Sequence, residues 1–313
     1  MEEQYDNFSK RHHVLDVLGF LLQKKKAGEP ASLIRLGDGE GRLLGFPEFV
    51  NKQATSNEVS GLDHSLQIWF GRDDFQTEDL LSLSTQLREA VKNADIVGLP
   101  RLKQYQAFHV YRYVAQAISQ FDLLNESQII TDAAIHRYLQ FGLFYRLLLE
   151  ELDFVGLITG RPQLADIIKN IFSIKELKQY LIPAEAIHPG GLEGEHYPDR
   201  FNSLKTELQV PYKGAIFLVG AGALGKIYCN WIKQLGGIAI DIGSICDSWS
   251  DVGRLVHDYH KIRHYNLLAG LSLSQAAKRF NTACKHFSMD AKHLEQSDVN
   301  QFINNLKYKN HYV

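Results

Sequence analysis

Cysteine is scarce in this sequence. Its 313 residues include three cysteines, Cys229, Cys246 and Cys284, and no two of them form a C-x-x-C pair. An odd number of cysteines without metal-ligand spacing argues against a disulfide framework and against a structural zinc site. We therefore expect reduced thiols, as in a cytoplasmic protein.

Long hydrophobic runs and an excess of charge are also missing. No apolar run approaches the roughly 18 residues that span a bilayer, and residues 1–13 are too polar for a signal peptide. The net charge of −2 does not indicate a nucleic-acid partner. Residues 252–313, however, carry nine Lys/Arg against four Asp/Glu, a local charge of +5. We expect a soluble cytoplasmic protein whose basic C-terminal part suits a peripheral contact with the inner face of the membrane.

Short apolar runs alternate with helical patterns along most of the chain. The expected strands lie at residues 32–36, 94–100, 127–131, 154–160, 180–182, 214–220 and 237–242, and the expected helices at residues 11–26, 78–92, 105–120, 134–149, 163–171 and 224–235. This alternation is typical of a parallel sheet with helices on both faces. From residue 252 only helical patterns remain. The sequence therefore predicts an α/β, Rossmann-like fold with a mostly parallel sheet over residues 1–250 and a helical C-terminal extension over residues 251–313.

An acidic turn follows the first expected strand. Gly37-Asp38-Gly39-Glu40 places two carboxylates one residue apart, between glycines that allow unusual backbone angles. Such a pair can approach one hard cation, and Mn²⁺ or Mg²⁺ held in this way commonly bridges diphosphate oxygens. Arg35, at the end of the strand, is a candidate phosphate ligand. The alternative is a tight turn in which Asp38 caps the following helix.

A glycine-rich loop follows a later strand. Residues 220–225 (GAGALG) form a G-x-G-x-x-G that opens an expected helix, and Asp241 ends the next expected strand. This context is typical of a dinucleotide site in which Asp241 binds a ribose. The same backbone amides, together with Lys226, suit the diphosphate of a nucleotide sugar, and a third alternative is helix–strand packing without a ligand. Because a dinucleotide unit usually comes first in its domain, the late position of this loop favours the nucleotide sugar.

Other loops carry polar groups at or near strand ends. Arg161, in Thr159-Gly160-Arg161, and Arg101 each lie just past a strand, where an arginine either binds phosphate or lies in solvent. The loop over residues 188–200 contains Glu193, Glu195 and His196. It is either an ordinary surface loop or a lid that carries a general base.

Together these stretches resemble a known family, the GT-D-type glycosyltransferases, which were first described as a domain of unknown function. The resemblance covers roughly residues 30–250 and rests on residues 34–40 (IRLGDGE), 95–100 (DIVGLP), 218–225 (LVGAGALG) and 240–244 (IDIGS), in that order. The strand followed by a D-x-E motif is its most specific part. The family implies a Rossmann-like fold, a divalent metal and transfer of a sugar from a nucleotide donor, typically UDP-linked.

The expected site combines these positions. Asp38 and Glu40 hold Mn²⁺ or Mg²⁺ and, with Arg35, form the catalytic group. The donor site is lined by Gly37, Gly39, Thr159, Gly160, Arg161, Gly220, Ala221, Gly222, Gly225, Lys226 and Asp241. The catalytic base is not assigned.

The expected function is metal-dependent transfer of a sugar from a nucleotide-sugar donor to a glycan or lipid-linked glycan acceptor. The resemblance places this reaction in bacterial surface polysaccharide or glycoprotein assembly. An NAD(P)-dependent oxidoreductase and a non-catalytic nucleotide-binding module stay open as alternatives. So does assembly into a homo-oligomer.

Overall fold

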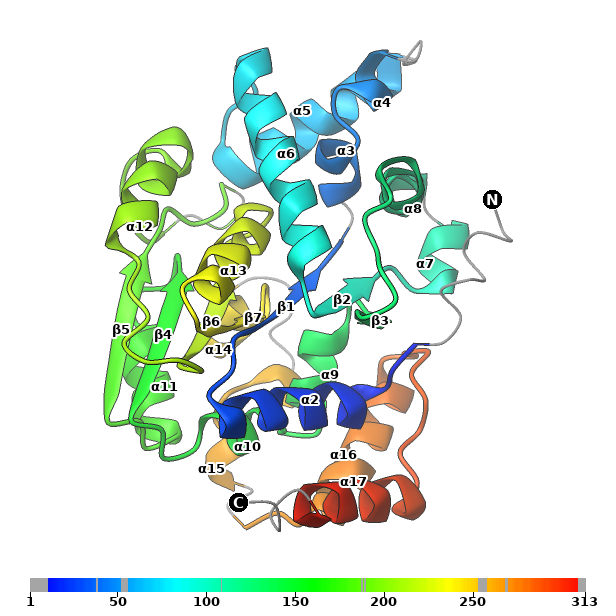
Figure 1. Ribbon diagram of the computed structural model, residues 1–313, viewed down its shortest axis with the longest axis vertical. Coiled ribbons are helices and arrows are strands. Elements are labelled where there is room, and N and C mark those ends of the chain that lie inside the picture. The colour runs from blue at the N-terminus through cyan, green and yellow to red at the C-terminus, as the bar shows by residue number, and fades with distance from the viewer. Residues whose placement is uncertain are drawn as a thin grey trace.

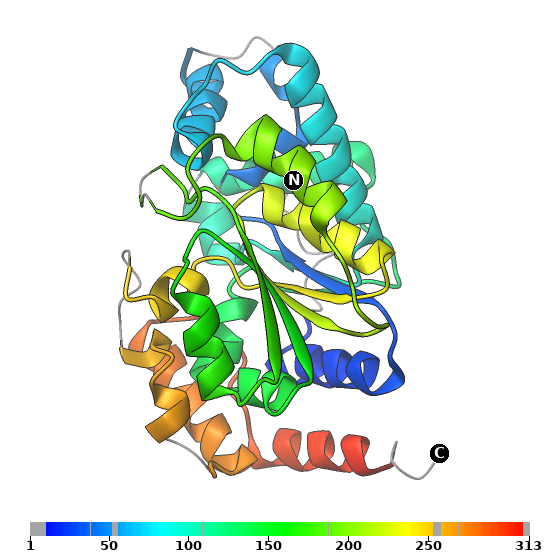
Figure 2. The ribbon, with the colours of Figure 1, turned by 90° about the vertical axis from the view of Figure 1, so that its left-hand side faces the viewer.

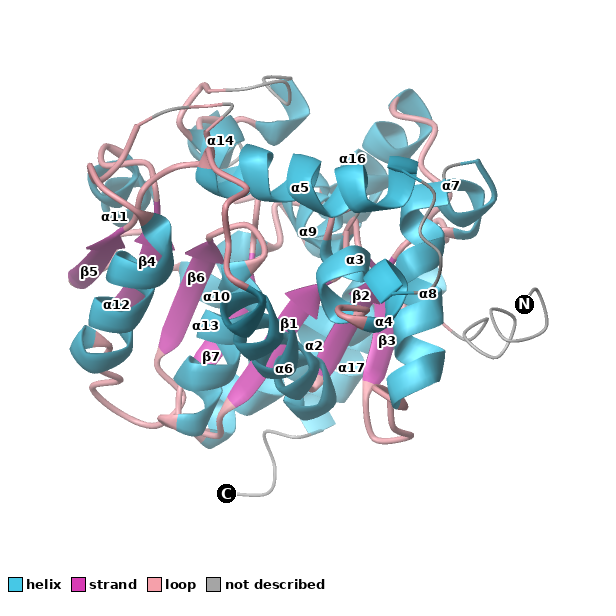
Figure 3. Cartoon of the chain, turned by 90° about the horizontal axis from the view of Figure 1, so that it is seen from above, coloured by secondary structure: helices cyan, strands magenta, loops and turns pink. Residues whose placement is uncertain are grey.

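The computed structural model describes residues 11–37, 39–51, 56–107, 109–186, 188, 190–252, 258–267 and 270–308. Within these residues the chain forms one sheet of seven parallel strands in the order β3-β2-β1-β7-β6-β4-β5 (Figures 1 and 3). The strands are β1 (Ala31–Arg35), β2 (Ile96–Leu99), β3 (Ile129–Asp132), β4 (Phe154–Thr159), β5 (Glu176–Leu181), β6 (Ile216–Gly220) and β7 (Ile238–Asp241). The α/β, Rossmann-like fold expected from the sequence is confirmed.

Helices cover both faces of this sheet (Figure 2). One face carries α2 (Val14–Ala27), α9 (Ile135–Phe141), α10 (Tyr145–Leu149), α11 (Leu164–Ile171), α14 (Ile245–Trp249), α15 (His264–Leu267), α16 (Leu273–His286) and α17 (Gln296–Tyr308). The other carries α3 (Glu40–Leu44), α5 (Ser56–Phe70), α6 (Thr77–Asn93), α8 (His109–Phe121), α12 (Phe201–Glu207) and α13 (Leu224–Gln234). The shorter elements are α4 (Glu48–Asn51), α7 (Leu102–Ala107), η1 (His196–Arg200) and η2 (Asp258–His260).

The sheet is buried on both sides, which explains the nearly continuous apolar runs. Successive side chains of a strand point to opposite faces. In β1, Leu33 joins the core that contains α2, whereas Ile34 joins the core that contains α6, and neither is exposed. Parallel sheets of this kind require apolar residues at every position rather than at every second one.

Local signals fix helix α2 as the sequence suggests. His13 caps its start by accepting a hydrogen bond from the amide of Leu15, and Asp16 accepts one from the amide of His13. The helix ends at Gly28, whose φ of +63° is a left-handed conformation that glycine adopts without a Cβ clash. Three lysines in the last turn, residues 24–26, favour the negative end of the helix dipole.

Two expected helices are interrupted. The pattern over residues 105–120 is divided between α7 and α8. The pattern over residues 134–149 breaks after α9, because the chain turns at Gly142 and Leu143 adopts a φ of +56° before α10 begins. A Cβ at Gly142 would lie 2.2 Å from the ring of Phe144, so the turn depends on glycine there.

The C-terminal helices pack onto the rest of the protein. Helix α16 contacts α9, and α17 runs beside α2 (Figures 1 and 2). Phe280 and Val299 are 1% exposed and belong to the same hydrophobic core as Leu18 of α2. The division of the chain near residue 250 stays a prediction. None of the described helices is long and apolar enough to cross a membrane.

Candidate functional site

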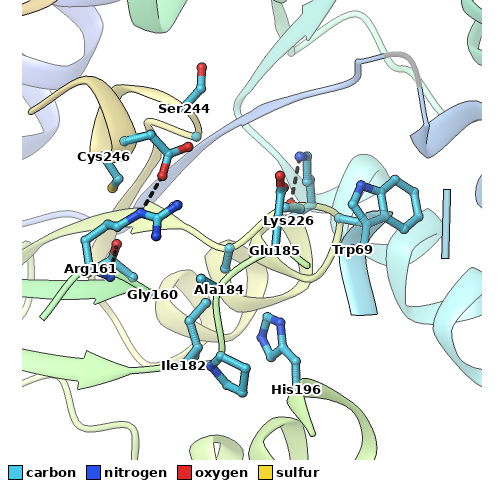
Figure 4. A pocket seen from close by; sticks show the side chains of 18 of the residues that line it. Trp69, Gly160, Arg161, Ile182, Ala184, Glu185, His196, Lys226, Ser244 and Cys246 are labelled. Carbon is cyan, nitrogen blue, oxygen red and sulfur yellow. Dashed lines mark hydrogen bonds and ion pairs between the residues drawn. The ribbon is translucent and has the colours of Figure 1, made fainter. Parts of the chain in front are cut away.

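A cavity of about 250 Å³ lies at the carboxyl edge of the sheet. It opens between the ends of β1, β4, β6 and β7, and α5 and the loop after β5 close its other side (Figure 4). Strands β2 and β3 extend the sheet on one side of β1, whereas β4 to β7 fill the other side. Ligands of open α/β sheets bind at such a switch in strand order.

Most of the expected site residues meet in this cavity. Those that line it are Arg35, Gly37, Glu40, Thr159, Gly160, Arg161, Gly220, Ala221, Gly222 and Lys226. They come from the ends of three strands, β1, β4 and β6, that are far apart in the sequence. Parallel strands present their following loops at one edge of the sheet, which explains why these residues lie together. Their role in donor binding stays a prediction.

The remaining expected residues lie elsewhere. Asp241 lies beneath the cavity wall and is 2% exposed, while Gly39 and Gly225 make packing contacts beside the wall. Asp38 lies outside the described residues. Arg101 lines a different cavity, where its guanidinium faces a glutamine and a methionine sulfur.

Four charged side chains form a buried chain of ion pairs at the floor of the cavity. Lys226 Nζ lies 2.5 Å from Glu40 Oε1 and 3.4 Å from Asp241 Oδ2. Arg35 Nη2 lies 3.1 Å from Asp241 Oδ1. Lys226 and Glu40 are 3% and 6% exposed. The second oxygen of Glu40 accepts a hydrogen bond of 2.9 Å from the amide of Gly37, so both carboxylate oxygens are engaged.

The ion pairs shift the pKa values within this chain. Burial alone would lower the pKa of Lys226, but Asp241 and Glu40 together raise it above its ordinary value. Burial likewise opposes ionisation of Asp241, but Arg35 and Lys226 hold its pKa below the usual range. Lys226 and Asp241 are therefore both charged at neutral pH. The oxidoreductase alternative loses support, because a buried, doubly paired Asp241 does not present a carboxylate to a ribose.

The glycine-rich loop presents its backbone to the cavity. Gly222 has a φ of +55°, a conformation that a β-branched residue rarely adopts. Helix α13 starts two residues later, and Lys226 Nζ donates a hydrogen bond of 2.9 Å to the carbonyl of Gly222. A helix start offers unpaired amides and the positive end of the dipole, both of which suit an anion.

Arg161 lies on the opposite wall. Its Nε lies 2.7 Å from Asp247 Oδ1, and its Nη1 donates a hydrogen bond of 3.0 Å to the carbonyl of His188. The side chain is 6% exposed, so its orientation is set by these partners. Arg161 thus brings a fixed positive charge to the cavity wall.

Aromatic residues form the third wall. Trp69 and Phe70 end helix α5, with ring centroids 6.2 Å apart, and Phe70 lies 6.0 Å from His196. His196 bonds the hydroxyl of Tyr228 at 2.9 Å, and burial lowers its pKa to about 3. The imidazole is therefore neutral. The two glutamates of this loop do not line the cavity: Glu193 is exposed, and Glu195 pairs with Arg72 at 2.5 Å.

Glu185 is a cavity residue that the sequence analysis missed. It follows β5 within residues 182–185, and its side chain lines the cavity near Lys226 and Trp69 (Figure 4). Burial is the main reason that its pKa rises to about 7, and the neighbouring Asp247 adds to the rise. Its position just past a strand end was the available signal, as for Arg35 and Arg161.

A ready metal site is not present in the part of the chain that the structure describes. No group of three or more His, Cys, Asp or Glu side chains is arranged there to hold an ion. Of the expected D-x-E pair, only Glu40 is described, and it is already paired with Lys226.

The chain is similar to one protein family and to several solved structures. The family described as "GT-D fold-like domain" matches residues 12–170, a stretch that includes the acidic turn and Arg161. A solved structure described as "The highly conserved domain of unknown function 1792 has a distinct glycosyltransferase fold" is 14% identical, with a TM-score of 0.52 over 84% of this chain and 91% of that chain. Another, "A New Glycosyltransferase (DUF1792) from Streptococcus sanguinis", is 16% identical, with a TM-score of 0.49 over 80% of this chain and 90% of that chain. No curated protein matches the sequence.

Proposed function

The chain belongs to the family of GT-D fold-like domains, which matches residues 12–170 of 313, and on that premise we propose that it is a glycosyltransferase acting on a nucleotide-sugar donor. The observation that carries the proposal is the arrangement around the glycine turn. The start of α13, Lys226 and Arg161 meet in one cavity at the switch point of the sheet. A nucleoside diphosphate is the ligand class that such a cavity suits.

The donor diphosphate lies against the glycine turn in this proposal. The backbone at Gly222 has no side chain to keep a phosphate away, and Gly222 and Ala223, directly before α13, line the cavity. Arg161 supplies a positive charge from the opposite wall. Arg35 stabilises the floor of the cavity through its ion pair with Asp241. We propose a UDP-linked donor because the family resemblance implies one.

The next question is whether the residues at the acidic turn can hold a divalent metal. The resemblance implies Mn²⁺ or Mg²⁺ on Asp38 and Glu40, and this stays a prediction. Glu40 does not fit it as the structure stands, because one oxygen pairs with Lys226 and the other with the Gly37 amide. An ion that reached Glu40 would have to displace a buried ammonium. No step of the proposed reaction is therefore assigned to a metal.

The chain's own charges help the leaving group. Negative charge develops on the diphosphate as the bond to the sugar breaks, and preorganised donors at that position stabilise the transition state. The glycine-turn amides and Arg161 are fixed before the reaction, the first by α13 and the second by Asp247. Such groups need no reorganisation during the reaction.

The acceptor is proposed to be a glycan or lipid-linked glycan in bacterial surface polysaccharide or glycoprotein assembly. Trp69 and Phe70 offer an apolar wall suited to the carbon face of a sugar ring. The basic residues after residue 251 suit an approach to an anionic membrane surface, at about 1 kcal/mol for each lysine or arginine near that surface.

Nucleotide binding tests the proposal against both alternatives. Thermal unfolding is followed with UDP, UDP-hexoses and NAD⁺, each with and without Mn²⁺. We expect UDP and UDP-sugars to raise the midpoint, since a ligand at 100 times its Kd adds about 2.7 kcal/mol to the free energy of unfolding. A rise with NAD⁺ and none with UDP would favour the oxidoreductase. UDP binding without any sugar transfer would favour the non-catalytic module.

A further inference from the structure

Glu185 is set apart from the other carboxylates at the cavity by its lack of a partner. Glu40 pairs with Lys226, Asp241 with Arg35, and Asp247 with Arg161. The Glu185 carboxylate makes no hydrogen bond or ion pair with any residue that the structure describes. A mostly buried acid without a partner weakens the fold, so its presence in a cavity points to a functional role.

The Glu185 carboxylate lies directly over the glycine turn. Its Oε1 is 3.1 Å from the position that a Cβ on Gly222 would occupy, and Cδ1 of Trp69 is 3.7 Å from the same point. Glu185 and Trp69 therefore flank the backbone that is proposed to hold the diphosphate. This is where the sugar attached to that diphosphate, and the hydroxyl that attacks it, must lie.

The backbone around Glu185 is fixed. The amide of Ala184 donates a hydrogen bond of 3.0 Å to the carbonyl of Gly190, and the amide of Ala186 donates one of 3.0 Å to the carbonyl of Ile68 in α5. These bonds tie the residues on both sides of Glu185 to the loop and to the helix that carries Trp69. The carboxylate is thus held on a rigid support, as a catalytic group requires.

We propose that Glu185 is the general base of the transfer reaction, an assignment that rests on the proposed glycosyltransferase function. The acceptor oxygen forms a bond to the anomeric carbon of the donor sugar, and its proton passes to a carboxylate oxygen of Glu185. The bond between the anomeric carbon and the phosphate oxygen breaks, and its electron pair leaves with the nucleoside diphosphate. A single displacement of this kind inverts the anomeric configuration.

The electrostatic surroundings support this role. Four charged groups face Glu185: Asp247 and Glu40 favour its protonated form, whereas Lys226 and Arg161 favour the carboxylate. Burial is the largest effect and, together with the two acids, raises the pKa of Glu185 to about 7 against the influence of Lys226 and Arg161. A base with a pKa near the working pH combines a useful fraction of the ionised form with enough strength to accept the proton.

The test compares Glu185→Gln with the wild-type protein and with Glu193→Gln, a matched control on an exposed acid of the same loop. We expect Glu185→Gln to lower kcat for sugar transfer by about 10²- to 10⁴-fold, the usual contribution of a general base. Its Kd for UDP, measured by calorimetry, should stay within about threefold of wild type, because UDP presents no acceptor hydroxyl. Glu193→Gln should match wild type in both measurements.

Four results would overturn the assignment. Retention of more than about a tenth of the wild-type kcat by Glu185→Gln would remove the base role, as would a transfer product of retained anomeric configuration. Loss of UDP affinity in parallel with kcat would indicate a structural role instead. If wild-type protein binds UDP yet transfers no sugar from any donor, the proposed function fails and the assignment fails with it.

Discussion

Replacing Lys226 with methionine is the sharpest perturbation of the cavity floor. Methionine keeps most of the length and the apolar part of the side chain but removes the ammonium. Glu40 then retains only the Gly37 amide as a partner, and Asp241 retains only Arg35. We expect a large loss of stability, because Glu40 is left as a buried carboxylate without a counter-charge.

The expected loss of stability follows from the distances of Lys226 to Glu40 and to Asp241. At an effective dielectric constant of ~20, unit charges 2.5 Å apart attract by about 7 kcal/mol and those 3.4 Å apart by about 5 kcal/mol. Desolvation of the buried charges offsets much of this attraction, so the measured cost of breaking such a pair is about 3–5 kcal/mol. That is a large part of the 5–15 kcal/mol that typically stabilises a folded protein.

Urea unfolding followed by tryptophan fluorescence measures the change. Lys233→Met is the control on the same helix, because Lys233 pairs with Asp95 at 2.8 Å and both side chains are 24% exposed. We expect this variant to lower the free energy of unfolding by about 1 kcal/mol or less. The double variant Lys226→Met/Glu40→Gln should recover about half of the loss, because the uncompensated charge is gone. If Lys226→Met unfolds within 1 kcal/mol of wild type, the buried ion-pair network does not hold the acidic turn as described.

Three further predictions concern the same cavity. Gly222→Val should weaken UDP binding by about tenfold or more in calorimetry, because Gly222 has a φ of +55° and a Cβ there would lie 3.1 Å from Glu185. Gly270 also has a positive φ, but no atom lies within 4 Å of a Cβ there, so the control variant Gly270→Val should leave UDP binding unchanged. Lys226→Met should bind Mn²⁺ about tenfold more tightly than wild type in a calorimetric titration without nucleotide, because the ammonium that competes for Glu40 is gone. Equal affinities would show that no ion reaches Glu40. In urea unfolding, Glu185→Gln should be more stable than wild type by up to about 3 kcal/mol at pH 8 and equally stable at pH 4. The reason is that folding raises the pKa of Glu185 from 4.5 to about 7, so the wild-type protein loses stability as the pH rises from 4.5 to 7. A difference that does not change with pH would contradict this.

The sheet and its strand ends could be predicted from the sequence because their signals are local. Apolar runs bounded by turn residues gave all seven strands, with differences of a few residues at their ends. The helices from α3 to α5 were not predicted from the sequence. In the structure Gly61 lies inside α5, where a Cβ would be 2.4 Å from the guanidinium of Arg42. The close approach of Arg42, from α3, to the backbone of α5 joins two separate helices, which a local pattern cannot reveal.

The grouping of several candidate residues at one edge of the sheet could be predicted, but the ion pairs between them could not. Knowing that loops after parallel strands share one edge was enough to bring Arg35, Arg161 and Gly222 together. Nothing local indicates that Lys226 would reach Glu40, because that pair joins segments far apart in the chain and depends on how α13 packs. Glu185 was not predicted, because it lies between the expected strand at residues 180–182 and the expected loop over residues 188–200.

The most direct test of the central claim is to measure nucleoside diphosphate release from a panel of UDP-hexoses and UDP-N-acetylhexosamines in the presence of simple glycoside acceptors. Chromatography would follow UDP and the new glycoside together. The account predicts that at least one donor gives UDP and glycoside in equal amounts, and that Gly222→Val slows this reaction at a fixed donor concentration. If no donor releases UDP while NAD⁺ binds the protein, this cavity is not the site of a glycosyltransferase.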